Sequence, residues 1–203
     1  MSKKLEESRS NLNDNVHFIG NGADLHMPDN AGGISKITNS IAFIGNIRDW
    51  IDKKELEDLI RLRPDLNFFF VGTVEDNMKE YLSNLLSKYM NTFFHYRINK
   101  QDMGKIYRKF NVVIIPYVKN EFIQSSRPIK IVESIICGTP VVTVPVNGYQ
   151  QNKYIRFATS AESFSLEIDY LLHLGDITKV EGYQDFCNGN SWQYIAKKML
   201  NLL

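Results

Sequence analysis

The sequence has few of the features that mark secreted, membrane-spanning or metal-binding proteins. It contains two cysteines in 203 residues, Cys137 and Cys187, and their separation fits neither a metal-ligand spacing nor a disulfide framework. The longest apolar runs, such as NFFFVG and VVIIP, are as long as a strand, whereas a membrane span needs roughly 20 residues. Residues 1–12 lack the apolar core of a signal peptide. We therefore expect a cytoplasmic protein without a transmembrane helix. The inner face of the membrane is a second location that such a protein could have.

An excess of charge of one sign is also missing. The formal net charge is +1, and the hydrophobic share of 43% and charged share of 23% are those of an ordinary globular protein. No overall electrostatic field attracts a polyanion, so a nucleic-acid partner is not expected. The chain is long enough to bury a sizeable core.

Apolar runs bounded by Gly, Pro or Asn alternate with helical patterns along most of the chain. The predicted strands are residues 16–20, 40–45, 66–72, 92–96, 111–117 and 139–145, and the predicted helices between them are residues 52–63, 75–89, 99–110 and a shorter stretch after Pro128. Most runs are continuous rather than alternating, which is typical of strands that helices cover on both faces. The sequence therefore predicts an α/β fold with three layers: an open parallel sheet between two layers of helices.

The end of the chain is predicted to form a C-terminal helical cap. Breaks at Gly175 and around residues 188–190 divide this part, and Asn190 or Ser191 would cap the final helix. Residues 27–33, MPDNAGG, are predicted to be the most flexible stretch. We expect one main domain over residues 16–175, followed by helices over residues 176–203.

Ligands in open parallel sheets bind beyond the carboxyl ends of the strands, so the loops that follow the strands are the places to look. One such loop, residues 116–128, leads into the short helix that begins near Pro128. Ser125, Ser126 and the free N–H groups behind them could face an anion, and Lys130 adds a positive charge one turn further on. A phosphate is a plausible ligand for this helix end.

The same helix carries a narrow polar stripe on an otherwise apolar surface, and Gly138 suits its end. Lys130 and Glu133 lie on that stripe. Glu133 could accept two hydrogen bonds from a ribose diol, which acids in this position relative to a diphosphate commonly do. The alternative is an exposed i,i+3 ion pair between Lys130 and Glu133, which spacing alone favours.

A second loop, residues 44–52, follows a predicted strand that ends at Gly45. Backbone N–H groups in this turn could hold a phosphate, and the guanidinium of Arg48 matches phosphate oxygens. A single glycine is more often an ordinary turn, however, and an Arg beside Asp49 is commonly part of a surface ion pair.

Two further loops have weaker signals. Glu75 and Asp76 begin a predicted helix, and for both we favour a capping role. His95, Tyr96 and Arg97 end a predicted strand, where main-chain groups flanked by an aromatic ring could hold a nucleobase. A lone His in such a place is more often structural than catalytic.

Four segments in order resemble the C-terminal half of the group 1 glycosyltransferases, which are family 4-like bacterial enzymes with the GT-B architecture. The segments are FIGNGADL, IAFIGNIRDWIDKKELEDLIRLRPDLNFFFVG, NTFFHYRINKQDMGKIYRKFNVVIIPY and RPIKIVESIICGTPVVTVP. The phrase with Trp50 and Asp52, together with the pattern from Pro128 to Glu133, resembles a branch that acts on bacterial surface polysaccharides. The resemblance implies a Rossmann-like domain, one half of a GT-B fold, that binds the nucleotide-sugar donor.

Carried over by position, the resemblance implies that Glu133 binds the ribose hydroxyls and Lys130 contacts the diphosphate. Gly45 and the residues after it resemble the phosphate-side loop, and Tyr96 and Arg97 match the position beside the base. The expected donor-binding set is Gly45, Asn46, Arg48, Tyr96, Arg97, Ser125, Ser126, Lys130 and Glu133.

Two positions of this set depart from the family pattern. Asn46 stands where many members have Arg, so that Arg48 lies off register, and Ser125 stands where many members have a first Glu. No carboxylate pair is placed to hold a metal beside a diphosphate, so no metal and no cofactor are expected.

In the GT-B architecture catalysis takes place between two domains, and this chain resembles one of them. Residues 1–15 resemble the remnant of the segment that links it to an N-terminal acceptor domain. We expect a domain that binds a UDP- or GDP-linked hexose or deoxyhexose, and that turns over only with the acceptor domain in cis or in trans. A peripheral contact with the membrane could come through that domain, and we assign no catalytic residue.

Two other functions are compatible with a parallel α/β fold. A non-catalytic module for nucleotide binding or protein interaction remains the main alternative, and Lys130 with Glu133 is the feature that separates it from an enzyme-derived domain. A phospho-receiver domain is disfavoured because Asp49, Glu75 and Asp76 are not in the arrangement that such a domain needs.

Overall fold

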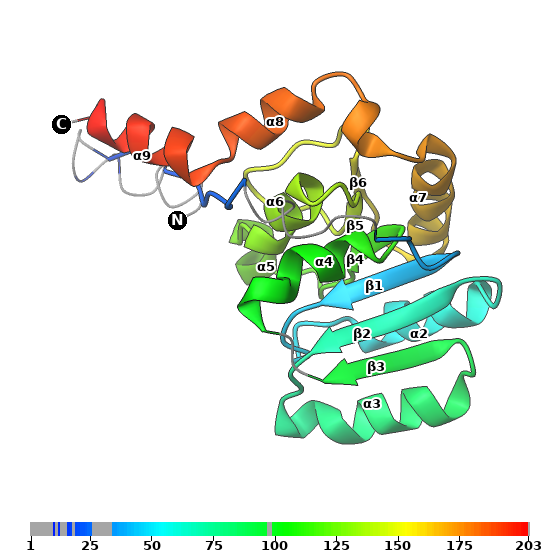
Figure 1. Ribbon diagram of the computed structural model, residues 1–203. Helices are drawn as coiled ribbons and strands as arrows, with labels where there is room; N and C mark the ends of the chain where they lie inside the picture. The colour runs from blue at the N-terminus through cyan, green and yellow to red at the C-terminus, as the bar shows by residue number, and fades with distance from the viewer. Residues whose placement is uncertain are drawn as a thin grey trace.

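A single parallel sheet organises the chain in the computed structural model, which describes residues 10, 12, 16–17, 19–25, 34–96 and 99–202, with only the backbone described at Lys100 (Figure 1). Its strands are β1 (Ser40–Ile44), β2 (Asn67–Gly72), β3 (Thr92–Tyr96), β4 (Val112–Ile115), β5 (Val141–Thr143) and β6 (Ile155–Phe157). Their order in the sheet is β3-β2-β1-β4-β5-β6, and every neighbouring pair is parallel. The predicted parallel α/β fold is confirmed.

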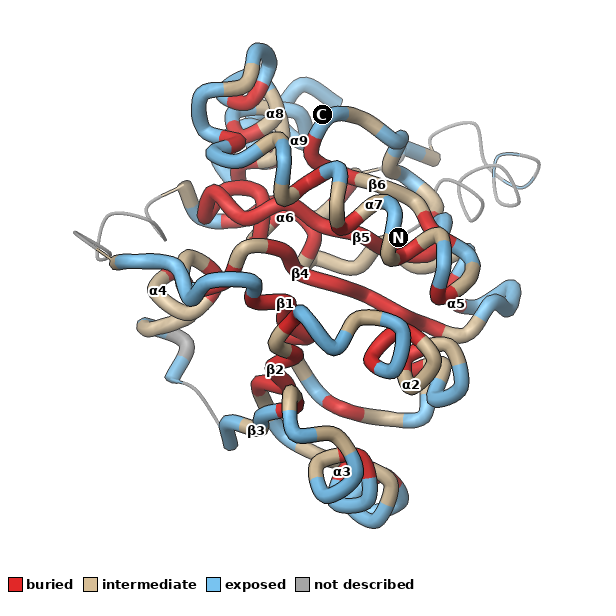
Figure 2. Tube along the Cα trace, turned by 90° about the vertical axis from the view of Figure 1, so that its right-hand side faces the viewer, coloured by how far each residue is buried: buried red, intermediate tan, exposed pale blue. Residues whose placement is uncertain are grey.

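The helices form layers on the two faces of the sheet. They are α2 (Lys53–Leu62), α3 (Asp76–Lys88), α4 (Met103–Arg108), α5 (Glu121–Ser125), α6 (Ile129–Ile136), α7 (Ala161–Leu174), α8 (Tyr183–Gly189) and α9 (Trp192–Leu200), with 3₁₀ turns at Lys100–Asp102 and Ile177–Lys179. Figure 2 shows α2, α3 and α7 on one face and α4 and α6 on the other, with α8 and α9 at one end. Within the described ranges, no helix is both long and apolar enough to cross a lipid bilayer.

The centre of the sheet is the core of the protein. Every residue of β1, β4 and β5 is buried, because helices cover both faces of these strands. The edge strand β3 differs: its burial decreases along the chain, and Tyr96 at its end is 70% exposed. The continuous apolar runs were therefore a correct sign of a sheet that is covered on both sides.

One predicted strand is wrong, and two elements were not predicted. Residues 16–17 and 19–20 form no strand. The nearby Ala23 bonds to Asn190 between α8 and α9, away from the sheet. The two elements that were not predicted are β6, which has three residues of which only Ile155 is fully buried, and α5, a five-residue helix in the expected loop.

The end of the chain agrees with the predicted helical cap. Gly175 ends α7 with a φ of +73°, and the chain breaks again between α8 and α9. Ser191 is the residue that caps α9, because its side chain accepts a hydrogen bond from the N–H of Tyr194. Residues 27–33, which we predict to be flexible, lie outside the described residues.

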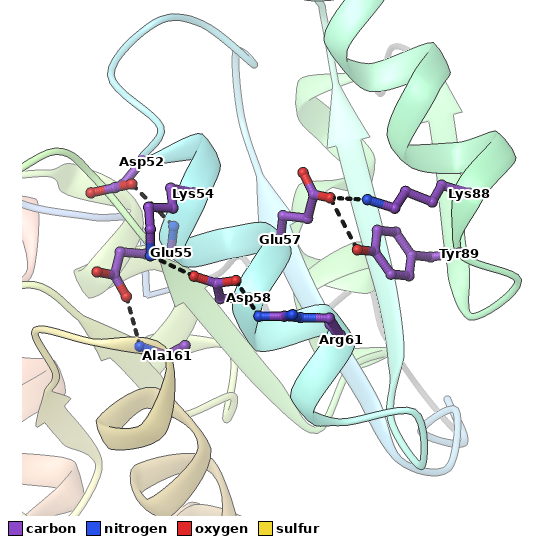
Figure 3. A network of polar contacts seen from close by, with 9 residues as sticks. All are labelled: Asp52, Lys54, Glu55, Glu57, Asp58, Arg61, Lys88, Tyr89 and Ala161. Atoms are coloured by element: carbon purple, nitrogen blue, oxygen red, sulfur yellow. Dashed lines mark hydrogen bonds and ion pairs between the residues drawn. The ribbon is translucent and has the colours of Figure 1, made fainter.

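Helix α2 is held between α3 and α7 by polar contacts of its outer face (Figure 3). Its Glu57 accepts hydrogen bonds from Lys88 and Tyr89 at the end of α3, with distances of 2.5 and 3.0 Å. Glu55 accepts from the backbone N–H of Ala161 at the start of α7, at 2.8 Å. The contact with Lys88 is exposed and the other two are partly buried, and polar contacts near the surface add little stability individually. Together they fix the direction of α2, whose first turn lies at the carboxyl edge of the sheet.

Two glycines at this edge allow the loops after β1 and β2 to approach each other. Gly45 and Gly72 have φ angles of +137° and +140°, which residues with a side chain rarely adopt. A Cβ atom added to Gly72 would lie 2.1 Å from the carbonyl oxygen of Gly45. Backbone contact, and not only backbone conformation, therefore requires glycine at position 72.

We predict that Gly72→Ala lowers the free energy of unfolding by about 2–4 kcal/mol, since it combines backbone strain with a backbone clash. Gly182→Ala is the matched control: its φ is +81°, but a Cβ there meets no atom within 4 Å. The control should lose only about 1–2 kcal/mol, the strain of a left-handed residue. Urea denaturation measures both, and equal losses would show that the contact between the loops is unimportant.

Candidate functional site

Three loops are joined by backbone hydrogen bonds at the carboxyl edge of the sheet. The loop after β1, residues 45–52, bonds to the loop after β2, where the N–H of Ile47 donates to the carbonyl of Thr73 at 2.7 Å. On its other side the N–H of Asp52 donates to the carbonyl of Pro116, after β4, at 2.8 Å. This edge is where parallel sheets bind ligands, and the bonds give it a fixed shape.

Lys130 reaches into this edge from the first turn of α6. Its Nζ lies 4.4 Å from the ring centre of Phe43 and 5.3 Å from that of Tyr117. It is also close to the Cα of Gly45, because a Cβ added there would lie 2.7 Å from Nζ. Burial lowers the pKa of Lys130 to about 8, although the charge of Glu133 acts in the opposite direction. The surroundings of this ammonium group therefore disfavour its charge.

No carboxylate of the described residues forms an ion pair with Lys130. The alternative interpretation, an i,i+3 ion pair between Lys130 and Glu133, is therefore wrong. Aromatic faces attract a cation, but they supply no negative charge and no hydrogen-bond acceptor of ordinary strength. Among the described residues Lys130 is thus a partly buried cation without an ion-pair partner, an arrangement that is costly unless an anion compensates the charge.

Glu133 turns toward α4 instead of toward Lys130. Its Oε2 accepts a hydrogen bond of 3.0 Å from the hydroxyl of Tyr107. Tyr107 is 1% exposed, and burial together with the charge of Glu133 raises the pKa of its hydroxyl well above the usual value. Glu133 itself is partly exposed, so its remaining lone pairs can accept hydrogen bonds from a ligand.

Arg48 is held in place by two neighbours of different kinds, an aromatic ring and a carboxylate. Its guanidinium lies 4.1 Å from the ring centre of Trp50, and its Nη2 lies 2.9 Å from an oxygen of Glu75. Asn46 donates to the same Glu75 carboxylate at 3.2 Å and accepts from the hydroxyl of Thr73 at 3.1 Å. The Nε of Arg48 is buried and has no hydrogen-bond partner among the described residues.

This cluster corrects two expectations about the acidic residues. Glu75 occupies the N-cap position of α3, but its side chain makes no cap hydrogen bond and binds Arg48 instead. Asp76 lies in the first turn of α3 and pairs with Lys79. Arg48 does not pair with Asp49, because Glu75, brought close by the loop after β2, competes successfully for it.

Two aromatic residues that the sequence analysis did not assign to the site connect Arg48 to Lys130. Trp50, under Arg48, contacts the edge of Tyr117, with ring centres 6.3 Å apart, and Tyr117 in turn lies beside Lys130. Burial raises the pKa of Tyr117 to about 12, so its hydroxyl stays protonated. A signal for Tyr117 existed in the sequence, since it directly follows Pro116 at the carboxyl end of a strand.

Ser125 and Ser126 lie at the end of α5, just before α6. Ser125 is the last residue of α5, and the Ser126 hydroxyl donates to the carbonyl of Ile123 at 2.7 Å. Pro128 is the N-cap of α6 rather than its first helical residue, and it makes no side-chain cap bond. Gly138, with a φ of +78°, ends the helix as predicted.

Tyr96 lies apart from this group of residues. It lines a pocket of about 400 Å³ between β3 and α3, which is also lined by Val74, Leu82 and Phe94 and by neither Lys130 nor Glu133. Arg97 lies outside the described residues. The assignment of these residues to a nucleobase site stays a prediction.

The loop after β5 is a further feature that the sequence analysis did not consider. With α8, β6 and the residue before Pro128 it forms a pocket of about 640 Å³, lined by Arg127, Asn147, Gly148, Tyr149, Gln150, Asn152, Ile155, Phe186 and Asn190. The hydroxyl of Tyr149 donates to the carbonyl of Pro128 at 3.2 Å, so this loop supports the start of α6. Burial raises the pKa of Tyr149 to about 12, although the charge of Arg127 acts against this shift.

Together these residues can bind an anionic group beside a pair of hydroxyl groups. The anion would meet Lys130 and the N–H groups at the start of α6, and the hydroxyls would meet the carboxylate of Glu133, one turn further along the helix. Nowhere in the described ranges do three or more His, Cys, Asp or Glu side chains gather as metal ligands would.

Comparison with known proteins gives a consistent result. A sequence model of the family described as "Glycosyl transferases group 1" matches residues 38–173. TuaH of Bacillus subtilis, whose name describes a teichuronic acid biosynthesis glycosyltransferase, is 24% identical over 164 residues, which are 76% of this chain and 40% of TuaH. The chain therefore spans less than half the length of this relative.

Two solved structures share the fold at low sequence identity. A variant of S. aureus TarM, crystallised with ligands that include UDP, has a TM-score of 0.69 and 17% identity over 100% of this chain and 42% of TarM. Anabaena HepE in complex with UDP and glucose has a TM-score of 0.71 and 14% identity over 98% of this chain and 60% of HepE.

We predict that Lys130→Met stabilises the protein at pH 7, by about 1–3 kcal/mol, because it removes a partly buried cation that forms no ion pair with any described residue. The pKa of Lys130 in the folded protein, about 8, lies below the ordinary 10.5. The charged ammonium group therefore destabilises the folded state fully below pH 8, and this destabilisation disappears as the pH rises toward 10.5. The difference between variant and wild type should shrink over that interval.

Urea denaturation at pH 7 and at pH 9.5 measures this effect. Lys54→Met, which removes an exposed lysine on α2, is the control and should change stability by less than about 0.5 kcal/mol at either pH. A loss of stability in Lys130→Met would mean that the aromatic contacts outweigh desolvation and that the charge has a structural role.

Proposed function

Because the chain belongs to the group 1 glycosyltransferases, we propose that it supplies the domain that binds the nucleotide-sugar donor in such an enzyme. The observation that carries the proposal is the ammonium group of Lys130, which is partly buried beside Gly45 with no carboxylate of the described chain paired to it. A donor diphosphate would provide the missing negative charge, and the first N–H groups of α6 would bind the same oxygens.

Glu133 supports the proposal through its place on the same helix. It lies three residues after Lys130 and keeps a partly exposed carboxylate. Carboxylates one turn from a diphosphate site are suited to the two hydroxyls of a ribose, because they can accept both hydrogen bonds. The donor would therefore lie along α6, with its diphosphate at the start of the helix and its ribose one turn further.

Arg48 would join this site only after a change of partner. In the structure Glu75 neutralises its guanidinium at 2.9 Å. A phosphate in the loop after Gly45 could compete with Glu75 for Arg48, while the ring of Trp50 would keep the guanidinium near the site. We therefore assign Arg48 a secondary role and Lys130 the primary one.

For the base and the sugar we propose a uridine diphosphate donor that carries a hexose. The support is indirect, since UDP is named in the complexes of both TarM and HepE, which share the fold at low identity. The relation to TuaH makes a role in surface polysaccharide synthesis the first choice. GDP-linked donors remain the competing choice, and one titration series distinguishes the two.

Transfer would require a second, acceptor-binding domain, in cis or in trans. The chain covers 40% of TuaH and 42% of TarM, so these relatives are much longer than the region that matches it. The residues described at the carboxyl edge can bind a donor, but we assign no catalytic base among them.

The first test is calorimetric titration with UDP, GDP and other nucleoside diphosphates. We expect one nucleotide to bind, and Lys130→Ala and Glu133→Ala each to weaken it by about 1–3 kcal/mol, the value of a hydrogen bond to a charged group. Lys54→Ala, on the exposed face of α2, should leave the affinity unchanged. A folded chain that binds no nucleoside diphosphate would favour the non-catalytic interaction module.

The second test is the pH dependence of that affinity. Only a protonated Lys130 attracts a phosphate, and its pKa in the free protein is about 8. Affinity should therefore fall by about tenfold between pH 7 and pH 9, because pH 9 lies one unit above the pKa and only about a tenth of the Lys130 side chains remain protonated there. Lys130→Ala should bind weakly with little dependence on pH over the same range, and an equally steep fall in this variant would show that another group is responsible.

A further inference from the structure

Tyr107 is a buried residue of α4 whose hydroxyl is the only group of the described residues that bonds to the carboxylate of Glu133. The hydroxyl donates to Oε2 at 3.0 Å, from a ring that is 1% exposed. A buried hydroxyl needs a partner, and here the partner is a side chain that is itself partly exposed to solvent. The contact therefore joins the interior of the protein to the proposed ribose site.

The position of Tyr107 is itself fixed by a chain of buried hydrogen bonds. The hydroxyl of Ser134 donates to the carbonyl of Thr139 at 2.8 Å, and the hydroxyl of Thr139 donates to the carbonyl of Tyr107 at 2.8 Å. Ser134 follows Glu133 on α6, so the chain of bonds leaves α6, passes through the start of β5 and α4, and returns to α6. Both hydroxyl side chains in it are fully buried.

This arrangement limits the orientation of the Glu133 carboxylate. A partly exposed glutamate normally samples several rotamers, and ordering it on binding a ligand lowers the affinity. With Oε2 held by Tyr107, the other oxygen and the remaining lone pairs have a defined direction before the ligand arrives. The raised pKa of Tyr107 means that its hydroxyl stays a donor throughout the physiological range.

We propose that Tyr107 is a positioning residue for Glu133, and that its hydroxyl makes the site selective for nucleotides with an intact ribose diol. The inference rests on the proposed function, in which Glu133 accepts hydrogen bonds from the ribose. Tyr107 does not touch the ligand, so its effect passes entirely through the carboxylate of Glu133.

The test compares UDP with 2′,3′-dideoxyuridine diphosphate, which keeps the base and the diphosphate but has no ribose hydroxyls. If GDP proves to be the nucleotide that binds, GDP and its dideoxy analogue take their place.

Tyr107→Phe keeps the buried ring and removes only the hydroxyl. We expect it to weaken UDP binding about tenfold, as for a lost hydrogen bond to a charged group, and to change dideoxy binding by less than about twofold. In a Glu133→Ala background, Tyr107→Phe should cause no further loss.

The control variant is Tyr89→Phe, which removes another tyrosine–glutamate hydrogen bond, the 3.0 Å contact with Glu57 between α2 and α3. It should leave the affinities for both nucleotides unchanged. A second variant, Glu133→Asp, keeps the charge but withdraws the carboxylate from the Tyr107 hydroxyl. It should lose UDP affinity in the same selective way, and it keeps the proposal testable if Tyr107→Phe does not fold.

The outcomes separate the inference from the proposed function. If wild-type protein binds neither nucleotide, the proposed function fails and the inference fails with it. If both bind, but Tyr107→Phe weakens both equally or neither, the function stands and the positioning role is overturned. If Glu133→Asp lowered the affinities for UDP and for its dideoxy analogue equally, the positioning role would be overturned as well. The position of the carboxylate would then have no specific effect on binding of the ribose diol.

Discussion

The ammonium group of Lys130 packs against Gly45 and two aromatic rings and has no counter-ion among the described residues; the carboxyl edge of the sheet depends on this interaction. Position 45 favours glycine because its φ is +137°, and the absence of a side chain there leaves room for Nζ of Lys130. The loop after β1 then passes close to β2, where Gly72 must also lack a Cβ. The fold thus brings two glycines in conformations that other residues rarely adopt and a desolvated charge to the same place.

The fold was predictable because it follows from local patterns. Continuous apolar runs identified β1, β2, β4 and β5 as buried strands, and helical spacing identified the helices between them. The failures are equally local in cause. Strand β6 has three residues and one fully buried side chain, which is too short a signal to recognise. Residues 16–20 have the composition of a strand, but the described ones, residues 16–17 and 19–20, do not join the sheet.

The site was predictable only in part, because its important contacts join residues that are distant in the sequence. Helical spacing places Lys130 and Glu133 on one stripe, and from spacing alone they should pair. In the structure each is drawn to a different partner, since β1 and β4 end beside Lys130 while α4 places Tyr107 against Glu133, 26 positions away. Glu75 likewise leaves its expected capping role for Arg48. Local sequence patterns do not predict these contacts, because the contacts depend on how the sheet arranges its loops in space.

A comparison of two lysines shows why the position of Lys130 is better explained by a ligand than by stability. The side chain of Lys36 is exposed overall, but desolvation of its ammonium group lowers the pKa to about 8 as well. Its Nζ, however, donates to the carbonyl of Phe110 at 2.6 Å and lies 3.4 Å from the hydroxyl of Thr139, at the amino ends of β4 and β5.

The partly desolvated ammonium group of Lys36 thus has a hydrogen-bond acceptor within the protein, as structural lysines do. Lys130, at the opposite edge, has aromatic faces and no acceptor among the described residues. A methionine or leucine could fill the same space without the desolvation penalty of a charge. What such a residue could not do is bind an anion, and this ability is what distinguishes the carboxyl edge of the sheet from the amino edge.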